Sequence, residues 1–175
     1  TYVLRAGEEG EETVVVHVTG ESREILGASC RIVKDIVFEK DEGEHELVEY
    51  TDDWFAQDDA GNVWYLGEDT LAYEYDEEGN LEDTSAEGSW EAGVDGAEAG
   101  IVMLADPQPG LFYWQEFYED EAEDMGKVLR LNARVSIDFG DFEGCLVTKE
   151  WTVLEPGHLE HKYYCPGTGL VHVEE

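Results

Sequence analysis

The sequence predicts an all-β protein of antiparallel strands joined by hairpins, forming a sandwich, a barrel or a strongly curved sheet. Apolar and polar residues alternate in many short segments, as in residues 14–19 and 31–38, where β-branched and aromatic residues dominate. Turns that combine Gly with Asp or Asn separate these segments, and such residues tolerate a positive φ. No segment has the 3.6-residue period of a helix over about ten residues, so we expect about ten to twelve strands.

The strands of the N-terminal half follow from this alternation. Residues 31–38 and 47–55 flank an Asp-Glu-Gly turn, as the two arms of a hairpin do. Two turns that contain Gly-Asn, residues 58–62 and 76–80, separate the next strands. The strands expected here are 1–5, 14–19, 31–38, 47–55, 63–66 and 71–75.

The C-terminal half continues the pattern after a less regular middle. The acidic residues 119–126 form the one helical turn that we expect. If Pro156 and Gly157 make a two-residue hairpin loop, Trp151 faces Lys162, which suits a cation–π contact. The strands expected here are 101–104, 111–118, 128–139, 144–154, 158–165 and 169–174.

Three cysteines allow one disulfide and leave one thiol. The two-residue loop at Pro156-Gly157 would point Cys145 and Cys165 to opposite faces, so they would not bond to each other. Cys30 paired with either of them is then the expected bridge, if one forms.

The composition bounds the function. The 175 residues include 44 acids and 10 bases, for a net charge of −34, and this length predicts a single domain over 1–175. Such a surface repels nucleic acid and anionic lipid, and no apolar stretch approaches the ~18 residues of a membrane span. High salt, bound cations or a basic partner would offset the charge, and a halophile's proteome would also give this composition.

Three segments carry a resemblance to a known family: residues 53–68, 88–97 and 154–171, with the patterns AQDxxGNVWYxGE, GSWxAGVDGA and LEPxxxEHKYYxPGxG. With them the chain, over roughly residues 1–173, resembles an uncharacterised family of bacterial cell-envelope proteins, secreted or lipoprotein-like. Cys165 and Thr168 depart from the family, which has a small residue and an apolar residue at these positions. The resemblance implies an extracytoplasmic β protein, secreted or at the cell surface or periplasm, and brings no activity with it.

Catalytic motifs are weak. No serine lies in G-x-S-x-G, and Cys165 near His161 is better explained as a buried or bonded cysteine beside a surface histidine. Five tryptophans could wall a groove for sugar binding or glycoside hydrolysis, but tryptophans more often build the core of a β protein.

Two sets of residues are candidate sites. A carboxylate on an aromatic strand face is either a structural ion pair or part of a ligand site, and alternation places Glu68 beside Trp64 and Glu116 beside Trp114. The candidate ligand residues are Trp64, Glu68, Trp114, Glu116 and Lys162.

Calcium is the candidate cofactor, because it takes six to eight oxygen ligands. The two Gly-Asn turns and the acidic run at 119–124 supply such oxygens. Neither turn fits an EF-hand loop, and ordinary solvated turns explain them better than a metal site does. The candidate metal ligands are Asp58, Asp59, Asn62, Asp76, Glu78, Asn80, Glu123 and Asp124.

We therefore expect a non-enzymatic extracytoplasmic β domain that binds divalent cations or a small ligand at the cell envelope. One alternative is a structural subunit of an extracellular filament or surface layer, self-associating through edge strands by strand addition. The other is a hydrolase of envelope polysaccharide or peptide.

Overall fold

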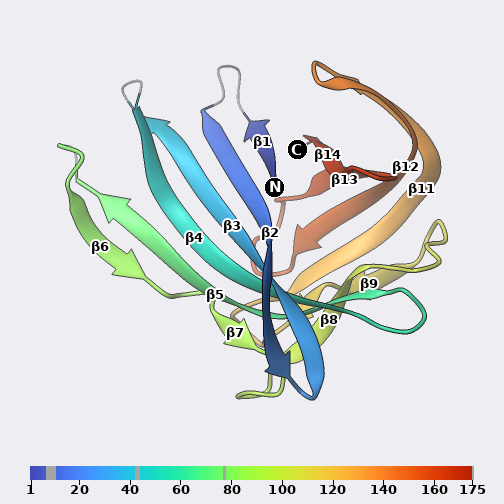
Figure 1. Ribbon diagram of the computed structural model, residues 1–175, viewed down its shortest axis with the longest axis horizontal. Coiled ribbons are helices and arrows are strands. Elements are labelled where there is room, and N and C mark those ends of the chain that lie inside the picture. Colours follow the sequence, from blue (N-terminus) through green and yellow to red (C-terminus); the bar gives the residue numbers. More distant parts are fainter. Residues whose placement is uncertain (7–10, 42–43, 77, 175) are drawn as a thin grey trace. The chain divides into compact units, whose positions relative to one another are not determined.

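The computed structural model describes residues 1–6, 11–41, 44–76 and 78–174 (Figure 1). These residues form 14 strands and no helix, and the pairings are antiparallel, so the all-β prediction is confirmed. The count exceeds the expected ten to twelve because the irregular middle contributes short strands such as β7 (Trp90–Glu91) and β10 (Glu116–Phe117). Strands of two residues are too short to show an alternation in the sequence.

The helical turn expected at 119–126 is wrong. Tyr118 and Ala122 form a β-bridge around a tight turn, in which Asp120 has a φ of 66°. A residue at positive φ leaves the helical region, and β11 begins at Asp124.

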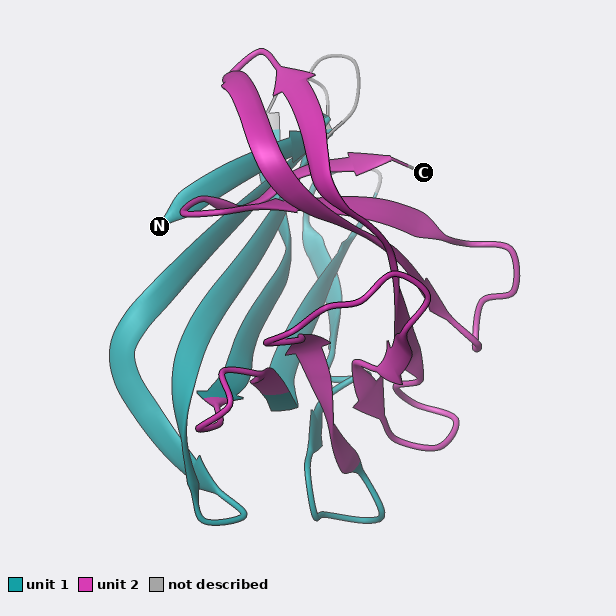
Figure 2. Cartoon of the chain, turned by 90° about the vertical axis from the view of Figure 1, so that its right-hand side faces the viewer, with its two compact units in different colours: residues 1–56, 65–97 teal, residues 57–64, 98–175 magenta. Residues whose placement is uncertain are grey.

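The chain divides into two compact units, residues 1–56 with 65–97 and residues 57–64 with 98–175 (Figure 2). The expectation of a single domain stays a prediction. The strands of unit 1 are β1 (Tyr2–Ala6), β2 (Glu12–Ile25), β3 (Ala28–Asp41), β4 (Glu44–Gln57), most of β5 (Val63–Tyr75), β6 (Leu81–Ser85) and β7. Those of unit 2 are β8 (Glu98–Met103), β9 (Phe112–Trp114), β10, β11 (Asp124–Ile137), β12 (Gly140–Thr152), β13 (Glu160–Cys165) and β14 (Gly169–Glu174).

In unit 1 the sheet runs in the order β1-β2-β3-β4-β5, with β6 and β7 both paired to β5. Its long strands curve along their length (Figure 2). An aromatic group forms part of the core, since Tyr65 stacks on Phe55 at 4.8 Å and meets the edge of buried Trp90 at 5.4 Å. Gly67 permits this packing, because a Cβ there would lie 2.2 Å from the carbonyl oxygen of Trp90.

In unit 2 the sheet runs in the order β14-β13-β12-β11-β9, and β8 pairs with β10. One hydrophobic cluster packs on this sheet, and it consists of Ala133, Cys145, Val147, Tyr163, Cys165 and Val171. Bulges interrupt the β11–β12 ladder between Val128 and Arg134, and bulges bend strands and increase their twist.

The disulfide joins Cys145 to Cys165 and leaves Cys30 as a buried free thiol, so the expected pairing through Cys30 is wrong. The physical reason is the register of β12 and β13. Lys162 pairs with Thr148 rather than Trp151, because residues 153–159 form a longer connection than a two-residue loop.

That shift is three residues, and an odd shift turns a strand's side chains to the other face. It brings Cys145 opposite Cys165. Trp151 instead contacts Lys149 of its own strand, whose Nζ lies 5.3 Å from the ring centroid.

Candidate ligand site on unit 2

One face of the unit 2 sheet collects polar and acidic side chains. The pairing aligns Gly126, Glu150 and Glu160 in one row across β11, β12 and β13. The next row aligns Val128, Thr148 and Lys162. Residues in register on neighbouring strands share a face, so Glu150, Glu160 and Lys162 come together although 148–152 and 160–162 are separate in the sequence.

Glu150 is the centre of this face. Its side chain is only 7% exposed, and Lys162 Nζ lies 3.3 Å from its Oε2. The hydroxyls of Thr148 and Tyr164 donate hydrogen bonds to its Oε1, at 2.6 and 3.0 Å. A buried carboxylate needs such partners, because leaving it unpaired costs several kcal/mol, roughly 3–5.

Lys162 forms ion pairs with two carboxylates. Its Nζ also lies 3.1 Å from Glu160 Oε2. Burial acts to lower the pKa of Lys162, but attraction to Glu150 and Glu160 outweighs it and the pKa is raised. The lysine therefore stays charged and is shared between Glu150 and Glu160.

Asp124 and Glu116 extend the cluster. Burial raises the pKa of Asp124, against the lowering effects of a hydrogen bond from Thr152 and the charge of Lys162, and Glu150 adds to the rise. A side-chain interaction with Glu116 acts to lower the pKa of Asp124 as well. We name Glu116, Asp124, Glu150, Glu160 and Lys162 the acidic cluster.

Tyr113 covers part of the cluster. It pairs with Gly126, and its ring occupies the space of a side chain there, since a Cβ on Gly126 would lie 2.9 Å from two ring carbons. Burial and the nearby Glu150 raise the pKa of Tyr113 to about 12. Its hydroxyl is therefore a neutral hydrogen-bonding group at neutral pH.

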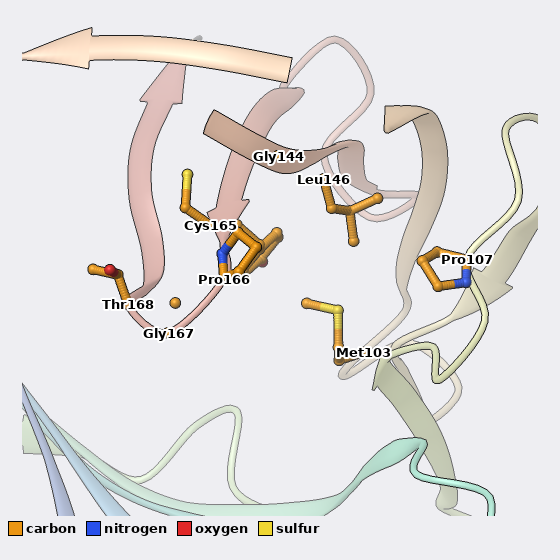
Figure 3. Close-up of a pocket in the computed structure, with 10 residues that line it drawn as sticks. Met103, Pro107, Gly144, Leu146, Cys165, Pro166, Gly167 and Thr168 are labelled. Atoms are coloured by element: carbon orange, nitrogen blue, oxygen red, sulfur yellow. The ribbon is translucent and has the colours of Figure 1, made fainter. Parts of the chain in front are cut away.

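An apolar pocket of about 460 Å³ adjoins the cluster. Tyr164 connects the two, because it lines the pocket and its hydroxyl bonds to Glu150. Figure 3 shows Leu146 and Met103 on opposite sides of this pocket, with Pro107 and Pro166 at its ends. The arrangement can hold an apolar group beside a negatively charged polar centre.

The structure brings together three of the residues predicted as site residues: Glu116 and Lys162 from the ligand set and Asp124 from the metal set. Glu150, Glu160, Tyr113 and Tyr164 were missed. Glu160 and Tyr164 lie in the pattern LEPxxxEHKYYxPGxG, but that pattern brings no site with it. Only the strand register, known in advance, would have aligned these four residues.

The other predicted ligand residues lie elsewhere. Trp64 Nε1 donates a hydrogen bond to Asp58, at 2.9 Å, and Glu68 pairs with Trp90 in unit 1. Gly67, at a φ of 129°, interrupts the alternation that placed Glu68 beside Trp64. Trp114 is 40% exposed and meets the edge of Phe117, because β9 ends at Trp114 before β10 begins.

The two Gly-Asn turns share one hydrogen-bond scheme. Asp58 Oδ1 accepts the backbone N–H groups of Ala60, Gly61 and Asn62, and its Oδ2 accepts from Trp64 and the Asn62 amide. These bonds, that of Trp64 first, hold the pKa of Asp58 at about 2.

Asp76 repeats this with the backbone of Glu78 and with Asn80, whose backbone bond is the largest cause of its lowered pKa. Both carboxylates act as acceptors within their own turns.

The remaining candidate metal ligands are Glu123 and Asp59, and neither is placed as a metal ligand would be. Glu123 accepts a hydrogen bond from the backbone of Asp120. Asp59 is exposed in its turn. Across the part of the chain that the structure describes, no group of three or more His, Cys, Asp or Glu residues is placed to hold a metal ion.

Unit 1 has an acidic face of its own. Asp35, Glu49 and Asp53 point to one side of β3 and β4 with Thr51, as their register shows. Tyr65 donates a hydrogen bond to Asp53, at 2.7 Å. Burial raises the pKa of Asp53 to about 7; the Tyr65 bond opposes this, and the charge of Asp35 adds to it.

Comparison with protein-family models, with curated proteins and with solved structures found no match to this chain. The described strands and loops include no helix long and apolar enough to cross a membrane. Fold and site therefore define an all-β protein with a partly buried acidic cluster beside an apolar pocket.

Proposed function

We propose that this protein is a non-enzymatic extracytoplasmic β protein that binds a small organic cation, an ammonium group on an apolar body. The observation that carries the proposal is the acidic cluster, in which Lys162 forms ion pairs with Glu150 and Glu160. Asp124 lies close enough to feel the charge of this lysine, and an apolar pocket adjoins the cluster. A bound ammonium would offset the excess negative charge, and its apolar part would fill the space between Leu146 and Met103.

The chemistry favours an organic cation over calcium. Calcium needs six to eight oxygen ligands around one point, whereas Glu150 already accepts from Thr148, Tyr164 and Lys162. An ammonium group needs two or three acceptors. Burial raises the pKa of Asp124, and a positive charge bound beside this carboxyl group would stabilise its charged form.

Two observations support an extracytoplasmic location. The Cys145–Cys165 disulfide is typical of oxidising compartments. The resemblance to envelope proteins points the same way.

The test is a thermal-shift and calorimetric titration with phenethylammonium, its neutral counterpart 2-phenylethanol, and calcium chloride. Binding to the folded state raises Tm with ligand concentration. We expect phenethylammonium to raise Tm and phenylethanol to have little effect. Asp124→Asn should weaken the response, whereas Glu82→Gln, exposed on β6, should leave it unchanged. Equal responses to the amine and the alcohol, or no response to the amine, would refute the proposal.

A second candidate function is self-assembly by strand addition. Strands β1 and β14 stand at the ends of the two sheet orders, and an end strand can pair with another chain. Size-exclusion chromatography over a range of concentrations tests it; a constant monomer volume counts against it.

A further inference from the structure

The opposite face of the unit 2 sheet carries mostly basic side chains where it crosses β11, β12 and β13. The register aligns Phe112, Lys127, Lys149 and His161 in one row across β9, β11, β12 and β13, and the row ends on β14 at one acid, Glu174. The adjacent row is Trp114, Met125 and Trp151. These rows alternate with those of the acidic cluster, so their side chains lie on the opposite face of the sheet.

Basic groups are concentrated on this face. Arg130 joins the two lysines, since its guanidinium lies 6.0 Å from the ring centroid of Tyr163, and Tyr163 shares the face of His161. Three of the chain's ten Lys and Arg residues are thus on one face of a protein with 44 acids. We name Lys127, Arg130, Lys149, His161, Trp114 and Trp151 the basic face.

Aromatic rings on this face are accessible. Phe112 is 66% exposed and Trp114 is 40% exposed. Lys149 lies over the Trp151 ring, and both line a pocket of about 310 Å³ with Pro156 and His158. Exposed aromatic rings next to cations offer a ligand both apolar surface and charge-assisted hydrogen bonds.

We propose that the basic face binds an acidic oligosaccharide of low charge density, with a carboxylate on every second sugar. The C–H groups of a sugar ring are weakly positive and pack on the negative faces of aromatic rings such as Trp114 and Trp151. Lys127, Lys149 and Arg130 receive the carboxylates as charge-assisted partners. This site is separate from the acidic cluster and does not depend on the function proposed for it.

Charge density decides against nucleic acid. Single-stranded nucleic acid also uses cations and stacking rings, but it carries a phosphate on every nucleotide. The net charge of −34 repels a polyanion in proportion to its charge. A ligand with sparse carboxylates keeps the local attraction and suffers less of this long-range repulsion.

The test is isothermal titration of the full chain with a hyaluronan hexasaccharide at moderate salt. Three probes are compared: the hexasaccharide, its neutral methyl ester, and oligo-dT of similar length. We expect the hexasaccharide to bind at least about tenfold more tightly than either of the others. Equal binding of the methyl ester, tighter binding of oligo-dT, or no binding of the hexasaccharide would overturn the proposal.

Variants locate the site. Lys149→Gln and Trp151→Ala should each weaken hexasaccharide binding at least about fivefold. The matched controls are Lys40→Gln, which removes a lysine from unit 1, and Phe139→Ala, which removes an 84% exposed ring of unit 2 outside the basic face. Both controls should bind as the parent does. The double variant Lys127→Gln/Lys149→Gln retains every aromatic ring and replaces Trp151→Ala as the test if that variant does not fold. Unchanged hexasaccharide binding by the double variant would overturn the assignment of the site.

Discussion

Cys145 and Cys165 lie directly across from each other on β12 and β13, with their Cα atoms 4.2 Å apart and their sulfurs bonded. Both side chains belong to the hydrophobic cluster of unit 2. The bond therefore fixes the register that separates the acidic cluster from the basic face.

Reduction of this disulfide should destabilise the protein. The two cysteines are 20 residues apart, and closing a loop of that length is worth about 3 kcal/mol of unfolding free energy by chain entropy. Urea unfolding of the parent and of Cys145→Ala/Cys165→Ala should show this difference. Alkylation of the denatured, non-reduced protein should label Cys30 alone; labelling of all three cysteines would contradict the pairing.

Asp53 should make stability fall as pH rises. Its pKa in the fold is about 7, above the value of about 4 in an unfolded chain. Between these values the unfolded state loses the proton and the folded state retains it, so stability decreases from about pH 4 to 7 and then levels off.

We expect Asp53→Asn to remove about 2–4 kcal/mol of this pH dependence, measured by urea unfolding at several pH values. Asp83→Asn, exposed on β6, controls for the loss of one carboxylate. An unchanged pH profile in Asp53→Asn would show that the proton is not held there.

Asp58 should have the opposite dependence. Because its folded pKa is lowered to about 2, the stability it provides is present above the unfolded pKa of about 4 and is lost as pH falls through about 2. Asp58→Ala should lower Tm more than Asp76→Ala, since the first turn has the added bond from Trp64. Equal losses in the two variants would mean that this bond contributes nothing.

Glu116→Gln should stabilise the protein by about 1 kcal/mol. The amide of the introduced glutamine can donate a hydrogen bond to the Asp124 carboxylate, and the substitution removes one negative charge beside it. Thermal unfolding measures the change, with Glu98→Gln on the paired strand β8 as control. A lower Tm for Glu116→Gln would show that the carboxylate itself is needed.

Gly126→Ala should destabilise unit 2 by about 1–3 kcal/mol, because its methyl group would meet the Tyr113 ring at 2.9 Å. Near-ultraviolet circular dichroism should report the displaced tyrosine. Gly144→Ala has more room, with Pro166 3.8 Å away, but its φ of 75° adds strain and makes it a control for backbone effects alone.

The sequence by itself determined the fold class and the two Gly-Asn turns. Alternation and the Gly-Asn motifs are local properties, and a turn such as 58–62 makes its hydrogen bonds within five residues. The short strands and the turn at 118–122 were not predictable, because tertiary contacts outweigh local preference there.

The tertiary structure alone decided which residues meet. Pairing across β12 and β13 depends on the length of the connection at 153–159, and an error of three residues exchanges the two faces. That single register places Cys145 on Cys165, gathers Glu150 with Lys162, and puts Lys149 with Trp151 on the other side. Such contacts join residues that are distant in sequence, so no local pattern encodes them.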